Sequence, residues 1–152
     1  MLIKLFKIYL QKLRNYVLGD FRSKKLSQLI VKKIIKHNKK KFIKIVDYGT
    51  GYQPKVVHFV YEQLVKNYKK KIIVDCYDFY SKSDLKKLNS FKKNDINFYN
   101  INSIVKNKKK YDFCLINDVI HHIGIEKETV IVKILNNLIN ISKIVFIKDH
   151  FQ

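Results

Sequence analysis

A glycine-rich segment between a short apolar run and a helical pattern constrains the fold of this chain most strongly. The apolar run covers residues 42–46, an acid follows at Asp47, and Gly49 and Gly51 come next, one residue apart. Glycine accepts positive φ and has no Cβ, so a backbone can turn sharply here and a ligand can approach closely. Pro54 suits the first turn of a helix, and apolar residues at helical spacing follow it. The segment predicts a strand, a glycine turn and a helix, an arrangement that holds dinucleotide-like ligands.

Further strand-like runs alternate with helical patterns along the rest of the chain. The sequence predicts strands over 71–78, 95–102, 111–116 and 143–148, and helices over 56–68, 83–91 and 126–140. Such alternation is typical of an α/β fold. We therefore expect a doubly wound, mostly parallel, Rossmann-like sheet of about five strands, with right-handed crossovers and helices on both faces.

The first forty residues carry a helical pattern of their own. Gly19 and Asp20 interrupt it, so we predict two N-terminal helices with a break between them. We expect these helices to pack on the main body, although the first is cationic and amphipathic, which would also suit an anionic membrane surface. The predicted organisation is an N-terminal helical segment over 1–40 and a single Rossmann-like domain over 41–152.

The chain has a formal net charge of +20, almost all of it from lysine. A basic chain attracts anions, so weak contact with nucleic acid or an anionic membrane is one interpretation. Codon bias is the other, because lysine, isoleucine, asparagine, tyrosine and phenylalanine are all abundant. Arginine, which reads phosphate and guanine by bidentate contacts, occurs only at Arg14 and Arg22. This scarcity argues against a specialised nucleic-acid reader.

The two cysteines point to a reducing compartment. Cys76 and Cys114 lie inside apolar runs, and we predict buried free thiols rather than a disulfide or a metal site. The N-terminus lacks the pattern of a signal peptide, and no uncharged apolar run is long enough to span a bilayer. We expect a cytoplasmic protein, with peripheral membrane contact as the alternative.

The predicted ligand site lies beyond the carboxyl ends of the strands, where open parallel sheets bind ligands. The glycine turn, Asp78, Asn102 and residues 117–122 all fall at such ends. An acid at the end of the second strand can accept hydrogen bonds from both hydroxyls of a ribose. Asp78 is favoured over Asp75 because Asp75 would lie within the strand. The alternative role for Asp78 is a helix cap or a turn residue.

This set of motifs resembles the class I S-adenosylmethionine (SAM)-dependent methyltransferases, from about Phe42 to Phe151. Residues 47–51 (Asp-x-Gly-x-Gly) are similar to the first motif of that family, and residues 111–123 to its fourth-strand signature, which ends in a His-His loop. The resemblance implies SAM as cofactor, and the residue spacing predicts no metal site. The cofactor-binding residues that it implies, or that the strand ends suggest, are Asp47, Gly49, Gly51, Asp78, Asn102, Asn117 and Asp118.

Three features of the sequence depart from the family pattern. Gln53 stands where many members have a third glycine, and Asn102 replaces the usual adenine-contacting acid. Family members also continue with two more strands after the fifth, which here is the last. The fifth strand is therefore predicted to be an exposed apolar edge. Either another chain or segment covers it, or the protein is a shortened and inactive member.

The activity that the resemblance implies is methyl transfer to an unknown small-molecule or lipid-linked acceptor. His121 and His122 are the candidate general bases, with His150 as a third, and a purely structural role is the alternative for the pair. Two other functions stay open: a non-catalytic, truncated methyltransferase-like domain, and a basic protein that binds or modifies nucleic acid. A nicotinamide-binding domain is a weaker fourth, because the third glycine of that fingerprint is missing.

Overall fold

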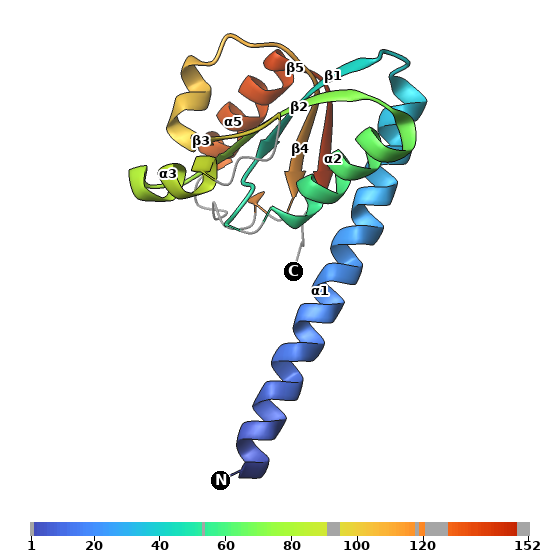
Figure 1. The fold of residues 1–152 in the computed structure, drawn as a ribbon. Helices are drawn as coiled ribbons and strands as arrows, with labels where there is room; N and C mark the ends of the chain where they lie inside the picture. The colour runs from blue at the N-terminus through green and yellow to red at the C-terminus, as the bar shows by residue number, and fades with distance from the viewer. Residues whose placement is uncertain (1, 53, 91–94, 118, 121–127, 149–152) are drawn as a thin grey trace.

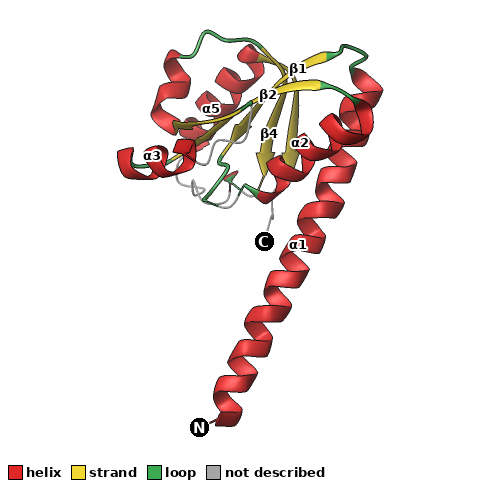
Figure 2. Ribbon diagram, viewed as in Figure 1, coloured by secondary structure: helices red, strands yellow, loops and turns green. Residues whose placement is uncertain are grey.

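The structure, a computed structural model, describes residues 2–52, 54–90, 95–117, 119, 120 and 128–148. Five strands form one parallel sheet in the order β3-β2-β1-β4-β5 (Figures 1 and 2). They are β1 (Phe42–Tyr48), β2 (Lys71–Asp78), β3 (Ile96–Asn100), β4 (Tyr111–Asn117) and β5 (Ser142–Lys148). The predicted doubly wound, parallel α/β fold is confirmed.

Helices cover both faces of the sheet, and this is why its central strands are apolar almost throughout. The C-terminal part of α1 (Leu2–His37) lies on one face with α2 (Lys55–Tyr68) and α3 (Lys82–Ser90), over a core that includes Ile34, Ile45 and Leu64. The 3₁₀ helix η1 (Ile101–Lys106) and α5 (Glu128–Ile141) lie on the other, over a core that includes Val46 and Cys114.

The parallel register brings the carboxyl ends of the strands to one edge of the sheet. Asp78 pairs with Asn100 across β2 and β3, and Asn117 pairs with Lys148 across β4 and β5. Strands β2 and β3 lie on one side of β1, whereas β4 and β5 lie on its other side. The switch point of the topology is therefore between β1 and β4, next to the glycine turn.

The predicted break at Gly19 and Asp20 is wrong, because α1 is one helix through both residues. An interior glycine costs a helix only about 1 kcal/mol relative to alanine, which a helix of this length tolerates. The Asp20 carboxylate also accepts a hydrogen bond of 2.6 Å from the Lys55 ammonium of α2. The predicted packing on the body holds for the C-terminal part of α1, whereas its N-terminal part runs away from the sheet (Figure 1).

Two other boundaries differ from the prediction or refine it. The third strand ends at Asn100, so Asn102 lies in η1 and is exposed. The amide of Asn102 donates to the Asn100 side chain at 3.0 Å, and this cap ends the strand early. Ser81 caps α3: its hydroxyl accepts from the Asp84 amide at 3.1 Å, and its own amide donates to the Asp84 carboxylate at 2.9 Å.

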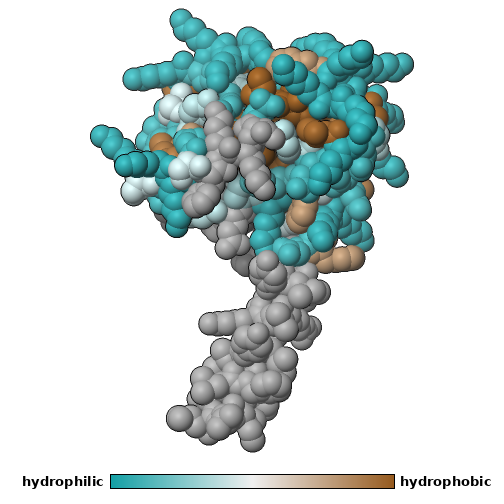
Figure 3. All heavy atoms as spheres, viewed as in Figure 1, coloured by the Kyte–Doolittle hydropathy of each residue, from teal (hydrophilic) through white to brown (hydrophobic). Residues whose placement is uncertain are grey.

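The structure also bears on the predictions about the cysteines, the edge of the sheet and membrane-spanning helices. Cys76 and Cys114 are buried free thiols, as predicted. The strand order places β5 at an edge of the sheet, as predicted, while its cover by another chain stays a prediction. Hydrophilic residues cover most of the face seen in Figure 3, with a hydrophobic area in its middle. None of the helices in the described part of the chain could cross a membrane.

The continuity of α1 predicts that Gly19→Ala stabilises the protein. Alanine removes the conformational cost of glycine, so the helix should gain up to about 1 kcal/mol. Far-ultraviolet circular dichroism with thermal unfolding measures both helix content and midpoint, and Gln28→Ala in the same helix is the control. A fall in helix content or midpoint for Gly19→Ala would mean that the helix ends near Gly19.

Candidate cofactor-binding site

The glycine turn after β1 depends on a backbone that only glycine adopts readily. Gly49 has φ +77° and Gly51 has φ +72°. A Cβ on Gly49 would lie 2.1 Å from the Val119 Cγ2 atom, whereas a Cβ on Gly51 would meet no described atom within 4 Å. Gly49 is therefore needed for packing against the segment after β4, and Gly51 leaves its side of the turn open to a ligand.

The end of β2 and the residues directly after it hold the turn in place through hydrogen bonds. The Gly49 amide donates to the Tyr77 carbonyl oxygen at 2.8 Å, and the Gly51 amide donates to the Asp78 carboxylate at 2.5 Å. The buried Tyr80 hydroxyl donates to the Gly51 carbonyl oxygen at 2.6 Å. Gly51 is thus in direct contact with Asp78, and Gly49 contacts the residue before it.

Asp78 has acceptor positions that no donor in the described part of the chain fills. Its Oδ2 accepts from Gly51 and its Oδ1 accepts from the Phe79 amide at 2.6 Å. An ionised carboxylate has about four acceptor positions, so each oxygen retains one. Two acceptors on neighbouring oxygens match two neighbouring hydroxyl donors, which is the geometry of a ribose diol.

Asp75, the alternative acid, lies inside β2 and is 1% exposed. Its carboxylate accepts from the Tyr111 hydroxyl and the Lys109 ammonium, both at 2.8 Å, and from the Asn97 amide at 2.9 Å. The Asp75 carboxylate is therefore already hydrogen-bonded within the protein. Asp78 is the last residue of β2, as the sequence predicts.

A polar cavity of about 250 Å³ adjoins the glycine turn. It is lined by Ser23, Asp47, Gly49, Thr50, Pro54, Lys55, Val56, Val57 and Asn117. Asp47 is buried, and this burial raises the pKa of its carboxyl to about 7; the nearby Asp78 charge adds to the rise and the Thr50 hydroxyl opposes it. An acid with such a pKa is poised to ionise when a cationic group enters the cavity.

Asn117 presents an unpaired acceptor at the same cavity. Its Oδ1 atom is buried and has no hydrogen-bond partner in the described part of the structure. Such an atom costs about 1–3 kcal/mol unless a ligand or water donates to it. Asp47 and Asn117 come from the neighbouring strands β1 and β4. Together they can receive a cationic N–H donor.

Sequence reasoning missed four residues of this site. Ser23 lines the cavity from α1, and Lys55 lines it from the start of α2. Phe79 follows Asp78 and is 74% exposed, and Tyr80 anchors the turn. No local signal could have placed Ser23, whereas the aromatic pair directly after the strand-end acid was visible in the sequence.

The other site residues predicted from the sequence lie away from the cavity or outside the described part of the chain. Asn102 lies two residues past the end of β3, in η1. Asp118, His121, His122 and His150 lie outside the described residues. Among the residues that are described, no three His, Cys, Asp or Glu side chains gather into a group that could hold a metal ion.

Comparison with solved structures shows which known fold this chain shares. The plantazolicin methyltransferase BpumL, solved with a monoazolic desmethylPZN analog and S-adenosylhomocysteine (SAH), aligns with a TM-score of 0.60 over 90% of this chain at 19% identity. Magnesium protoporphyrin IX methyltransferase (ChlM) from Synechocystis PCC 6803, solved with SAH and with SAM, aligns with a TM-score of 0.55 over 84% at 15% identity. The fold is that of the class I SAM-dependent methyltransferases.

The likeness to these methyltransferases lies in structure rather than in sequence. The chain spans 49% of the BpumL chain and 56–59% of the two ChlM chains. No model of a known protein family matches the sequence, and no curated protein matches it either. The chain shares the fold of these methyltransferases, and likeness at this level of identity shows the fold alone.

The glycine geometry predicts different costs for two alanine substitutions. Gly49→Ala should lower the free energy of unfolding by about 3 kcal/mol or more, from left-handed strain plus the overlap with Val119. Gly51→Ala should cost about 1–2 kcal/mol, from strain alone. Urea unfolding measures both, and Val119→Ala in the Gly49→Ala background should recover part of the larger loss. Equal costs for the two would contradict this geometry.

The raised pKa of Asp47 predicts a falling stability between pH 4 and pH 7. The carboxyl of Asp47 has its ordinary pKa of 3.8 in the unfolded chain and a pKa of about 7 in the folded one, so the folded state holds more protons between these values. The free energy of unfolding should therefore decrease as pH rises, by up to about 4 kcal/mol. Asp47→Asn should remove this slope, while Asp95→Asn, an exposed control, should keep it. An unchanged slope in Asp47→Asn would place the titrating group elsewhere.

Proposed function

We propose that this chain binds SAM at the glycine turn and transfers its methyl group to an acceptor. The observation that carries the proposal is the contact between the Gly51 amide and the Asp78 carboxylate, next to a cavity with Asp47 and an unpaired Asn117 oxygen. These groups suit a nucleoside at one end and an amino-acid group at the other. The SAM and SAH bound to the structural neighbours support the proposal.

The nucleoside part would lie over the turn and the end of β2. Asp78 has one acceptor position left on each oxygen for the two ribose hydroxyls, and Gly51 leaves room for the backbone of the turn to approach them. The exposed Phe79 ring offers a face on which adenine can stack. Asn102, exposed just beyond β3, remains our proposed contact for the adenine edge.

The amino-acid part would lie in the polar cavity. Its ammonium group matches Asp47, which ionises more readily beside a cation, and the unpaired Asn117 oxygen. Its carboxylate matches the first amides of α2, which line the cavity, because a helix N-terminus attracts anions. Ser23 closes the cavity from α1. Both charges of the amino acid thus find partners of opposite sign.

When bound, SAM supplies a methyl group on a positively charged sulfur, and the protein supplies position and a water-poor surrounding. His121 and His122 are the proposed general bases for a hydroxyl or amine acceptor, and Asp118 a proposed cofactor contact. The acceptor we propose is a small or lipid-linked molecule. BpumL and ChlM are named for different acceptors, so likeness to them does not choose one.

This function predicts that Asp78→Ala abolishes SAM binding. Loss of two hydrogen bonds to a charged acceptor should weaken the affinity by roughly 100-fold or more. Isothermal titration calorimetry of the purified chain with SAM, and with NAD as a comparison ligand, measures the effect. Asp95→Ala, which removes an exposed acid at the start of β3, is the matched control and should bind SAM normally.

The same titration separates the competing functions. Binding of NAD but not SAM would replace the methyltransferase by a nicotinamide-dependent protein. Binding of SAM without transfer to any acceptor would favour the non-catalytic domain. Binding of neither ligand by the folded chain would overturn the proposal, and salt-dependent binding to RNA or DNA would then favour the nucleic-acid alternative.

A further inference from the structure

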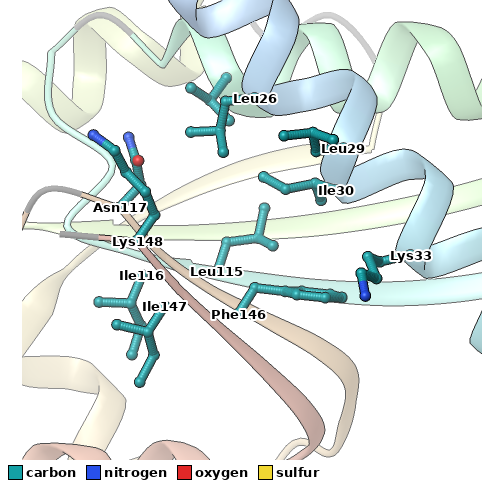
Figure 4. Close-up of a pocket in the computed structure, with 11 residues that line it drawn as sticks. Leu26, Leu29, Ile30, Lys33, Leu115, Ile116, Asn117, Phe146, Ile147 and Lys148 are labelled. Carbon is teal, nitrogen blue, oxygen red and sulfur yellow. The ribbon is translucent and has the colours of Figure 1, made fainter.

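The two edges of the sheet differ in chemistry. At the carboxyl edge, Asp47 and Asp78 lie at strand ends, and an apolar cavity of about 170 Å³ adjoins the polar one and shares Val56 and Asn117 with it. Apolar side chains of α1 and the sheet line this second cavity (Figure 4), among them Leu26, Leu29, Ile30, Leu115 and Phe146. The amino edge lies roughly 20 Å away, at the other end of the strands, and carries lysine instead.

Three runs of three lysines each stand at the start of a strand. Residues 39–41 lead into β1, residues 69–71 into β2 and residues 108–110 into β4, while β5 begins with Ser142 and Lys143. All the strands are parallel, so their starts meet at one edge of the sheet. The order β3-β2-β1-β4-β5 makes the three runs and Lys143 neighbours in space. The topology therefore gathers lysines that are far apart in the sequence.

The acids close to these lysines do not cancel their charge. Lys109 donates to the Asp75 carboxylate at 2.8 Å, while Lys40 and Lys143 share the Asp112 carboxylate at 3.5 and 3.1 Å. The side chains of the two acids are only 1% and 12% exposed, so lysines within the protein already meet their charge. The remaining lysines of the three runs leave the surface positive.

Five lysines of the three runs are exposed, and their side chains make no ion pair with any described residue: Lys39, Lys41, Lys69, Lys71 and Lys108. We call these five residues the lysine row. Neighbouring strands lie about 4.8 Å apart, so the edge from β2 to β5 is about 14 Å long. A nucleic-acid strand carries one charge per roughly 3.4 Å of its axis. About four phosphates can therefore lie along the row.

A cavity at the same edge contains an aromatic ring. It has a volume of about 350 Å³, and it is lined by Phe42, Tyr111 and Asp112 together with Lys40, Lys44, Lys110 and Lys143. The Lys44 ammonium lies 5.8 Å from the centroid of the Phe42 ring. The cavity is larger than one of about 150 Å³ that holds a benzene molecule, so a nucleobase can enter it and pack on Phe42. An anionic membrane would match the lysines but has no planar ring for this cavity.

We infer that the amino edge of the sheet binds single-stranded nucleic acid without reading its sequence. The phosphates lie along the lysine row, and one base packs against Phe42. The scarcity of arginine agrees with this, because phosphate attraction and stacking need no bidentate contact to a base edge. The surface lies at the opposite edge from the glycine turn, so the bound strand is held away from the proposed methyl donor. The inference is independent of the proposed function.

Fluorescence anisotropy tests the inference with labelled oligo(U) and oligo(dT) strands of about twelve nucleotides. Both should bind alike, because phosphates and base faces are common to RNA and DNA. With about four phosphates contacted, the logarithm of the association constant should fall against the logarithm of the salt concentration with a slope of about −3. Binding should thus be roughly 50-fold weaker at 200 mM than at 50 mM NaCl. Added SAH should leave it unchanged.

Matched variants locate the surface. One variant removes four charges of the row and should at least halve the salt slope and weaken binding at 50 mM NaCl by at least roughly tenfold: Lys39→Gln, Lys41→Gln, Lys71→Gln and Lys108→Gln combined. The control has the same net charge, loses four exposed lysines of α1, α3 and α5, and should bind normally: Lys25→Gln, Lys82→Gln, Lys86→Gln and Lys133→Gln combined. Phe42→Leu keeps an apolar side chain but removes the ring, so binding should weaken roughly tenfold at an unchanged slope.

Several results would overturn the inference. Equal losses in the two fourfold variants would show attraction to the net charge alone, and normal binding by Phe42→Leu would remove the base contact. Competition by SAH would place the strand at the cofactor cavity. Binding to phosphatidylserine vesicles but to neither oligonucleotide would assign the lysine row to a membrane surface. Failure to bind SAM would overturn only the proposed function, because strand binding is also measured without cofactor.

Discussion

The hydrogen bond from the Gly51 amide to the Asp78 carboxylate fixes the part of the molecule on which the candidate site depends. It joins the turn after β1 to the end of β2, and it needs a backbone with positive φ at Gly51. The parallel register makes the contact possible, because Tyr48 and Tyr77 are paired neighbours just before the two groups. Together with the bonds from the Gly49 amide to Tyr77 and from the Tyr80 hydroxyl to Gly51, this charge-assisted bond holds the turn that leads into α2 and lines the polar cavity.

Two buried acids in this sheet, Asp75 and Asp47, lie in different environments. Asp75 receives three donors, from Tyr111, Lys109 and Asn97, so its burial is compensated. Asp47 is nearly as buried, yet its pKa rises to about 7 because desolvation outweighs its favourable contacts. A neutralised acid of this kind costs stability. Asp47 lines the polar cavity at the carboxyl ends of the strands, where a cationic ligand group would offset this loss of stability.

The two adjoining cavities give α1 a role beyond covering the sheet. Ser23 lines the polar cavity, whereas Leu26, Leu29 and Ile30 line the apolar one, all within two turns of the same helix. The ion pair between Asp20 and Lys55 ties this stretch to the start of α2. The same helix therefore lines both cavities. Its packing decides the shape of both.

The sequence by itself determined the parallel sheet, the glycine turn and the strand-end acid, because each is written in neighbouring residues through periodicity and backbone preference. The helix break predicted at Gly19 was wrong, because the local cost of about 1 kcal/mol is outweighed by the rest of a long helix. It also misplaced the end of β3, which the Asn100 cap decides. Only the tertiary structure brought Ser23 to the glycine turn and Lys148 beside Asn117, because strand register and helix packing join residues that no spacing along the chain relates.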